Sequence, residues 1–145
     1  MMPDPEHTAD LVVNVTEDAD VSVVIVRASR LLSAHGASAP DRTRILTVCS
    51  ELARNILRYG VHGFIAVSAI PSERGVCVVV DAVDHGPGIA DIEAALRDHY
   101  STGGSLGLGL PGASRLMDHL HIANRASGGA HVRAERTIRP LPKNA

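Results

Sequence analysis

The feature that most constrains the fold is a pair of apolar, β-branched segments joined by a short turn. Gly63–Ile70 and Val76–Val83 flank the turn Pro71–Gly75, and this arrangement predicts a β-hairpin. The second segment is nearly continuous valine, so we expect a strand whose two faces are both covered, or nearly so. The chain must therefore supply a sheet together with further elements that pack against it.

The spacing of apolar residues elsewhere predicts the remaining elements. The resulting order, β-α-α-β-β-(α)-α-β-β, predicts an α+β two-layer sandwich, with a mixed, mostly antiparallel sheet and the helices packed on one face. No repeat or linker marks a second domain, so we expect residues 1–145 to form one domain with a core at about 11–138 and short flexible tails. The expected strands are Leu11–Thr16, His121–Arg125 and His131–Ile138, and the expected helices are Ala19–Ala34, Ser38–Tyr59, Asp91–His99 and Leu108–His119.

Composition excludes several classes of protein. The chain is 45% hydrophobic and 21% charged, as globular proteins are. It has no Trp and a formal net charge of −2, which argues against nucleic acid as a partner. No apolar run reaches the roughly 18 residues of a membrane span, and Met1–Asp10 is polar and acidic, unlike a secretory signal. Cys49 and Cys77 lie in apolar segments and are expected to be free core thiols, although they could pair, which favours a cytoplasmic protein.

Two polar side chains stand out on the most periodic predicted helix. Glu51 and Asn55 are four residues apart, so they share one face of the helix, at the edge of its apolar stripe. An amide oxygen there can ligate magnesium, and a neighbouring carboxylate can take a proton from an attacking hydroxyl or water. The alternative is a solvated helix edge on which Glu51 pairs ionically with Arg54 or Arg58. The stripe consists of Ile45, Cys49, Leu52 and Ile56.

Two glycine-containing segments follow the hairpin. Asp84–Gly88 comes directly after the valine strand; it is either plain turn chemistry or an aspartate that accepts from an exocyclic amine, beside glycines that let a flat ring approach. The run Gly103–Gly112 has five glycines in ten residues and leads into a helix, where backbone amides suit phosphate. Its G-x-G-x-x-G match does not indicate a dinucleotide site, because no predicted strand leads into it. A mobile glycine loop is the alternative.

Taken together and in this order, the segments resemble the GHKL ATPases, the family of gyrase, Hsp90, histidine kinases and MutL. Ser50–Ile56 is similar to the N box of that family, Asp84–Ile89 to its first glycine box and Ser105–Leu110 to its second. The glycine run and Arg115–Asp118 resemble, more narrowly, the RsbT-like branch of the small anti-sigma-type serine/threonine kinases. The resemblance extends from about Leu11 to Ile138.

The resemblance implies a Bergerat fold that binds ATP with Mg²⁺. By position in the motifs, Glu51 would be the catalytic base, Asn55 the magnesium ligand and Asp84 the acceptor for the adenine amine. The glycines expected to shape the base pocket are Gly86 and Gly88, and those expected to form the lid and phosphate cradle are Gly103, Gly104, Gly107 and Gly109.

The implied function is phosphorylation of Ser or Thr on a STAS-domain antagonist, within partner switching in a sigma-factor or stress-response cascade. A regulatory phosphatase or a sigma factor is a further expected partner, and a homodimer is compatible with the family. Two alternatives stay open: a non-catalytic anti-sigma factor that senses nucleotide and acts by sequestration, and a plain ATPase that uses water.

Two positions depart from the family pattern. Ala130 follows Gly128-Gly129, where many members have threonine near the adenine, so we expect base binding to be weaker by about 1 kcal/mol. Ser105 stands where the sporulation anti-sigma kinase has arginine. The charge of the γ-phosphate would then be met by Arg54, Arg58 or a residue of a partner.

Overall fold

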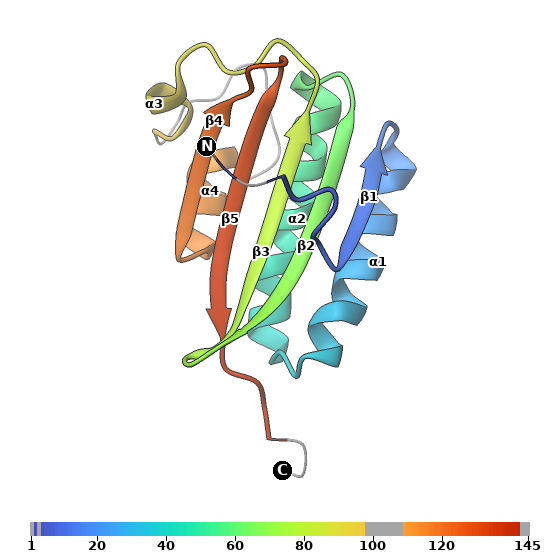
Figure 1. Cartoon of the computed structure of the whole chain (residues 1–145), viewed down its shortest axis with the longest axis vertical. Coiled ribbons are helices and arrows are strands. Elements are labelled where there is room, and N and C mark those ends of the chain that lie inside the picture. Colours follow the sequence, from blue (N-terminus) through green and yellow to red (C-terminus); the bar gives the residue numbers. More distant parts are fainter. Residues whose placement is uncertain (1, 3, 98–108, 143–145) are drawn as a thin grey trace.

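A single sheet forms one layer of the fold, and helices cover one of its faces (Figure 1). The computed structural model describes residues 2, 4–97 and 109–142. Among these residues, no helix combines the length and the apolar character that crossing a membrane requires. The elements are β1 (Leu11–Val15), α1 (Asp18–Ala34), α2 (Ala39–Tyr59), β2 (Gly63–Ser72), β3 (Gly75–Asp84), α3 (Ile92–Ala95), α4 (Gly109–Leu116), β4 (His119–Asn124) and β5 (Ala130–Ile138).

The predicted α+β sandwich is confirmed. The five strands lie in the order β1-β2-β3-β5-β4, and every neighbouring pair is antiparallel, so the sheet is not mixed as the prediction allowed. Helices α1, α2 and α4 lie on the same side of the sheet. Because each connection between paired strands is a hairpin or passes over this one helical layer, the other face of the sheet is left for the N-terminal segment to cover.

Several predicted boundaries are wrong by a few residues. The helix predicted at Leu108–His119 ends at Leu116, because β4 already pairs with β5 from His119. The helix predicted at Asp91–His99 is reduced to α3, and its last two positions lie outside the described residues. Hydrophobic spacing alone did not distinguish the end of α4 from the start of β4, since short apolar runs fit both periods.

The hairpin turn is tighter than predicted. Strand pairing continues through Pro71, which lies opposite Val76, up to the pair Ser72 and Gly75. A proline is tolerated there because β1 pairs with β2 only as far as Val67, so this part of β2 is an edge. Gly75 has φ +136, and a Cβ at this position would lie 2.1 Å from the carbonyl oxygen of Ile138.

The main core lies between the sheet and the helices. The predicted stripe of α2 is confirmed, since all four of its residues are at most 2% exposed. Val78 and Val80 of β3 pack in this same core. Alternation along the strand places Val79 and Val83 on the opposite face, which we call the outer face.

The outer face is covered in part by the N-terminal segment, residues 4–10, which crosses in front of the sheet (Figure 1). Ala9 packs against a small cluster that includes Phe64 and Val83. The carboxylate of Asp10 accepts a hydrogen bond from the backbone N–H of Ala69 at 2.7 Å. The prediction that both faces of the valine strand are covered, or nearly so, is therefore confirmed.

The outer face also holds a buried charged cluster. Asp81 is 2% exposed and binds Arg133 through both carboxylate oxygens, at 2.8 and 3.2 Å. His131 Nε2 lies 2.6 Å from Asp81 Oδ1. Since a buried carboxylate is costly without partners, these two side chains are what allows Asp81 to occupy a central strand.

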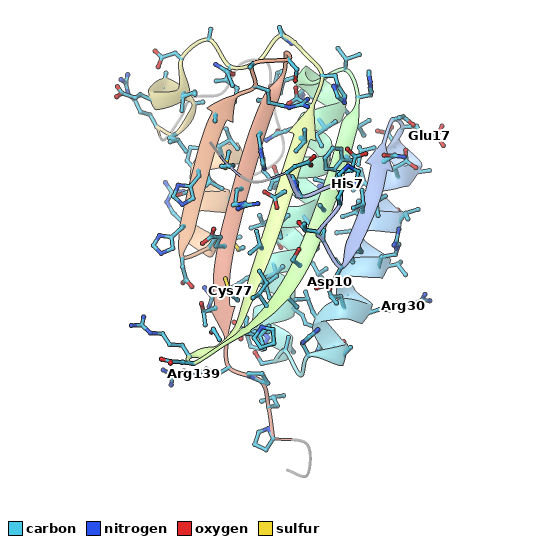
Figure 2. All side chains as sticks on the ribbon, viewed as in Figure 1. His7, Asp10, Glu17, Arg30, Cys77 and Arg139 are labelled. Atoms are coloured by element: carbon cyan, nitrogen blue, oxygen red, sulfur yellow. The ribbon has the colours of Figure 1, made fainter. Side chains whose placement is uncertain are left out.

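The two cysteines are free, as predicted, and lie on opposite faces of the sheet. Cys49, a residue of α2, is fully buried in the core between the helices and the sheet, and this burial raises the pKa of its thiol from 9.0 to about 12. Cys77 is only half-buried and lies on the outer face, so it is not the core thiol that was expected (Figure 2). Partial burial, and then the charge of Glu135, raise the pKa of the Cys77 thiol.

Cys49 gives the fold a specific sensitivity to alkaline pH. The unfolded thiol loses its proton from about pH 9, whereas the folded thiol keeps it to about pH 12. This contribution to stability is therefore complete below pH 9 and decreases as the pH rises. Between pH 8 and pH 10, the free energy of unfolding measured in urea should decrease by about 1 kcal/mol less in Cys49→Ala than in wild type. Cys77→Ala is the matched control and should reduce the loss less; equal losses in all three proteins would contradict this.

Candidate nucleotide-binding site

Helix α2 carries the first two candidate residues, and one of them, Glu51, contacts α4. Ser38 begins the helix by accepting a hydrogen bond from the Asp41 N–H at 3.2 Å, as the sequence predicts. Glu51 is only 7% exposed, and its Oε2 accepts a hydrogen bond from the backbone N–H of Gly109 at 3.3 Å. Asn55 is half-buried one turn further along. The first predicted segment is thus in contact with the end of the glycine run.

The alternative of an ion-paired helix edge applies only weakly to Glu51. The guanidinium of Arg54 lies 3.9 Å from Glu51 Oε1, and the Arg54 side chain is 64% exposed. A pair so long and so solvated contributes little. Arg58 instead lies over the ring of Tyr59, with 5.8 Å to the ring centroid. The burial of Glu51 therefore needs another explanation, and the amide of Gly109 is part of it.

Asp84 ends β3 with one carboxylate oxygen held by the backbone. Its Oδ1 accepts hydrogen bonds from the N–H of Gly86 at 3.0 Å and from the N–H of Ala130 at 3.1 Å. Within the described part of the chain, the other oxygen, Oδ2, accepts no hydrogen bond. The residue is half-buried, so Oδ2 is an oriented acceptor for an amine-bearing ligand.

Three glycines surround Asp84 so closely that no side chain fits in their place. A Cβ at Gly60 would lie 2.5 Å from Asp84 Cβ, and one at Gly129 would lie 2.0 Å from the Asp84 carbonyl oxygen. A Cβ at Gly86 would lie 2.7 Å from the Cα of Gly60. The end of α2, the loop after β3 and the turn before β5 therefore meet at this carboxylate.

The candidate residues lie on α2 or in contact with it. Gly60, which caps α2, contacts Asp84, while Glu51, which binds Gly109, lies nine residues before Gly60 on the same helix. This separation corresponds to about 13 Å along the helix axis, with Asn55 between the two ends. The distance from the base to the terminal phosphate of an extended nucleotide triphosphate is of the same order.

Two of the remaining predicted glycines, Gly88 and Gly109, have positive φ values. Gly88 has φ +82 and contacts Asn124 at the end of β4. Gly109 has φ +67 and begins α4. Gly103, Gly104 and Gly107 lie outside the described residues.

Sequence reasoning missed the contacts by which several residues shape the site. Gly60 and Gly129 contact Asp84 from segments far away in the chain, and the N–H of Ala130 binds its carboxylate. Asn124 and Arg125 bind the loop 84–89 through their side chains. The paired glycines before Ala130 were the one available signal, because a turn with two positive φ values has to fit against something.

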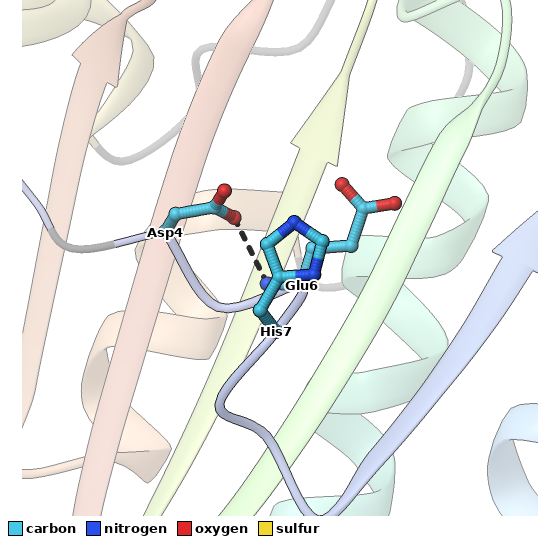
Figure 3. Close-up of side chains that lie close together, drawn as sticks. All are labelled: Asp4, Glu6 and His7. Atoms are coloured by element: carbon cyan, nitrogen blue, oxygen red, sulfur yellow. Dashed lines mark hydrogen bonds between the residues drawn. The ribbon is translucent and has the colours of Figure 1, made fainter.

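The side-chain oxygens on α2 suit magnesium better than an exposed acidic cluster elsewhere in the chain does. Within the described residues, one group of three carboxylate or imidazole ligand atoms lies within 4.8 Å of one another: Asp4, Glu6 and His7. All three are exposed, and they lie in front of the sheet, on the face away from α2 (Figure 3). Mg²⁺ prefers one or two protein oxygens together with ligand phosphates, and the amide of Asn55 can supply one.

Comparisons with known proteins agree with this fold. The model of the histidine kinase-like ATPase domain matches residues 15–136. The serine/threonine-protein kinase RsbT of Bacillus subtilis (strain 168) is 39% identical over 104 residues, which cover 72% of this chain and 78% of that protein.

Solved structures show the same fold. The RsbU and RsbW domains of Rv1364c from Mycobacterium tuberculosis match with a TM-score of 0.60 and 19% identity, over 91% of this chain and 35% of that longer one. The SiaB-SiaC complex from Pseudomonas aeruginosa matches with a TM-score of 0.59 and 17% identity, over 88% of this chain and 90% of the matched chain.

The chain therefore belongs to the histidine kinase-like ATPase domain family, which is the GHKL family that its motifs resemble. Within that family it belongs with RsbT, and the prediction of a protein serine/threonine kinase is confirmed by this relationship.

The close packing of glycines against Asp84 can be tested by substitutions at two neighbouring positions. Gly128 and Gly129 both have positive φ, so alanine is strained at either. A Cβ at Gly128 meets nothing within 4 Å, whereas at Gly129 it overlaps the backbone of Asp84. Gly129→Ala should lower the free energy of unfolding in urea by about 2 kcal/mol more than Gly128→Ala does. Equal losses would show that Asp84 and the turn are not packed as described.

Proposed function

We propose that this protein is an ATP-dependent kinase that phosphorylates Ser or Thr on a STAS-domain partner. Relationship to RsbT supports a kinase of the partner-switching type, and the family to which the chain belongs uses ATP. The site geometry supports the same residues that the motifs indicate. The single observation that carries the proposal is the alignment of Asp84, Asn55 and Glu51 along α2, with Gly109 bound to Glu51.

In this proposal Asp84 selects the base. Its Oδ1 is occupied by two backbone N–H groups, so only Oδ2 is available to accept from the exocyclic amine of adenine. The glycines around it let the flat ring approach the backbone. Guanine presents a carbonyl oxygen where adenine has its amine, so the carboxylate would repel it.

Glu51 would act as the general base at the other end of the site. Its carboxylate takes the proton of the substrate hydroxyl as that oxygen forms a bond to the γ-phosphorus, and the bond from this phosphorus to the β,γ-bridging oxygen breaks to release ADP. The N–H of Gly109 orients Oε2 of Glu51. Burial between α2 and α4 limits access of water to this carboxylate.

Asn55 would hold magnesium. Bound Mg²⁺ supplies charge neutralisation for the phosphates, which is the main requirement of phosphoryl transfer. Asn55 lies between Glu51 and Gly60, the cap residue that contacts Asp84, so the phosphates of a nucleotide seated on Asp84 would pass beside it.

Paired substitutions test the proposed roles separately. Glu51→Gln keeps an oxygen that can accept from Gly109 but removes the base, so transfer of phosphate to a STAS-domain protein from the same genome should fall by about 10²–10⁴-fold while the Kd for ATP stays unchanged. Asp84→Asn should instead raise the Kd for ATP by about tenfold or more, because the charge and an acceptor are lost. Radiolabelled transfer and calorimetry measure the two effects.

Glu73→Gln, at the exposed hairpin turn, is the matched control and should change neither quantity. Unaltered transfer by Glu51→Gln would overturn its role as base. A wild-type protein that binds ATP and retains a sigma factor without transferring phosphate to any STAS-domain protein would favour sequestration instead.

A further inference from the structure

The turn between β4 and β5 holds the loop Asp84–Ile89 at both of its ends. At the far end, the side-chain amide of Asn124 pairs with the backbone of Ile89: Oδ1 accepts from the Ile89 N–H and Nδ2 donates to the Ile89 carbonyl, each at 2.8 Å. At the near end, Nη1 of Arg125 donates to the carbonyl oxygen of Asp84 at 2.8 Å. Two adjacent side chains thus fix a loop that is remote from them in sequence.

The near end is held by a small network. The same nitrogen of Arg125 lies 3.3 Å from the carbonyl oxygen of Gly128 and 3.3 Å from Nδ1 of His85. A guanidinium can only donate, so a hydrogen bond between Arg125 and His85 requires Nδ1 of His85 to be the acceptor. The backbone closes the turn, since the N–H of Arg125 donates to the carbonyl oxygen of Gly129 at 2.8 Å.

The Ile89 end of the loop depends on the side-chain amide of Asn124. Asn124 uses the acceptor and the donor of its amide at once, which alanine and an ionised aspartate cannot do. The fit is close, because a Cβ at Gly88 would lie 2.7 Å from Asn124 Oδ1. Asn124 is also exposed, so it contributes no burial to the core. The contribution of its side chain to the structure is therefore the pair of hydrogen bonds to Ile89.

We propose that Asn124 is a positioning residue for the base pocket, which acts by fixing Ile89 and with it the loop that begins at Asp84. The inference rests on the proposed function of the site as an ATP site. With both ends of the loop fixed, Oδ2 of Asp84 meets a bound base in one orientation. When the far end is released, the loop can shift, and the preference for an amine over a carbonyl at that position decreases.

A role in positioning differs measurably from a role in stability. Loss of the pair should affect nucleotide selection and the exchange of the Ile89 N–H, while leaving global unfolding close to that of a neutral substitution on the same strand. His121→Ala is the matched control, since His121 is exposed on β4 and stacks with His119, at 6.2 Å between ring centroids, rather than with the loop.

The experiment compares wild type, Asn124→Ala, Asn124→Asp and His121→Ala in three measurements: hydrogen exchange of the Ile89 amide by NMR without nucleotide, Kd values for ATP and GTP by calorimetry, and the urea midpoint. Both Asn124 variants should speed Ile89 exchange and raise the Kd for ATP by about tenfold each, which corresponds to the loss of one or two hydrogen bonds. The Kd for GTP should change less, so the preference for ATP over GTP, measured as the ratio of their Kd values, should decrease. Their urea midpoints should match that of His121→Ala.

The outcomes separate the two proposals. If wild type binds ATP and the Asn124 variants keep its Kd and its ATP-to-GTP ratio, the positioning role is wrong while the ATP site stands. If the Asn124 variants lose stability in proportion to their lost affinity, Asn124 is structural and the inference is also overturned. If wild type itself binds no ATP, the proposed function fails, and the positioning role fails with it.

Discussion

The carboxylate of Asp84 is the interaction on which the rest of the site depends. One of its oxygens binds the backbone of the loop after β3 and the first residue of β5, so it joins two strands at the end of the sheet. The end of α2 approaches the same group closely enough that Gly60 admits no side chain. A single half-buried carboxylate thus determines where a helix end, a loop and a turn meet, and its second oxygen accepts no hydrogen bond from the described residues.

Helix α2 converts this local arrangement into a site of the right length. Its apolar stripe, fully buried against the sheet, fixes the rotation of the helix about its axis. That rotation places Glu51 against Gly109 at the start of α4 and Asn55 one turn nearer to Asp84. The same packing that stabilises the fold therefore sets the spacing between the group that would bind a base and the group that would accept a proton.

The sequence predicted those features that follow from local periodicity or from motif order. The stripe of α2, the valine hairpin and the polar residues of the three motifs were all visible in this way. Periodicity failed at the start of β4, where helix and strand both fit a short apolar run, and at the hairpin turn, where pairing continues through Pro71. The cover of the outer face by residues 4–10 gave no signal, because that segment has no periodic pattern.

The contacts of Asp84 could not be predicted for a different reason. Gly60 and Gly129 must be glycines because both lie against Asp84, which is remote from them in the chain. Asn124 and Arg125 are polar residues at the end of an exposed strand, a place where polar residues are ordinary. One sequence without related ones does not separate a side chain that binds a loop from one that binds water, whereas the hydrogen bonds at 2.8 Å do.

The most direct test of this account is a crystal structure of the protein with a non-hydrolysable ATP analogue and Mg²⁺. The account predicts density for the adenine amine on Oδ2 of Asp84, for the metal on the amide oxygen of Asn55, and for the terminal phosphate beside Glu51. Nucleotide bound elsewhere, for example on the outer face of the sheet, or a nucleotide in this site whose base does not contact Asp84, would contradict it.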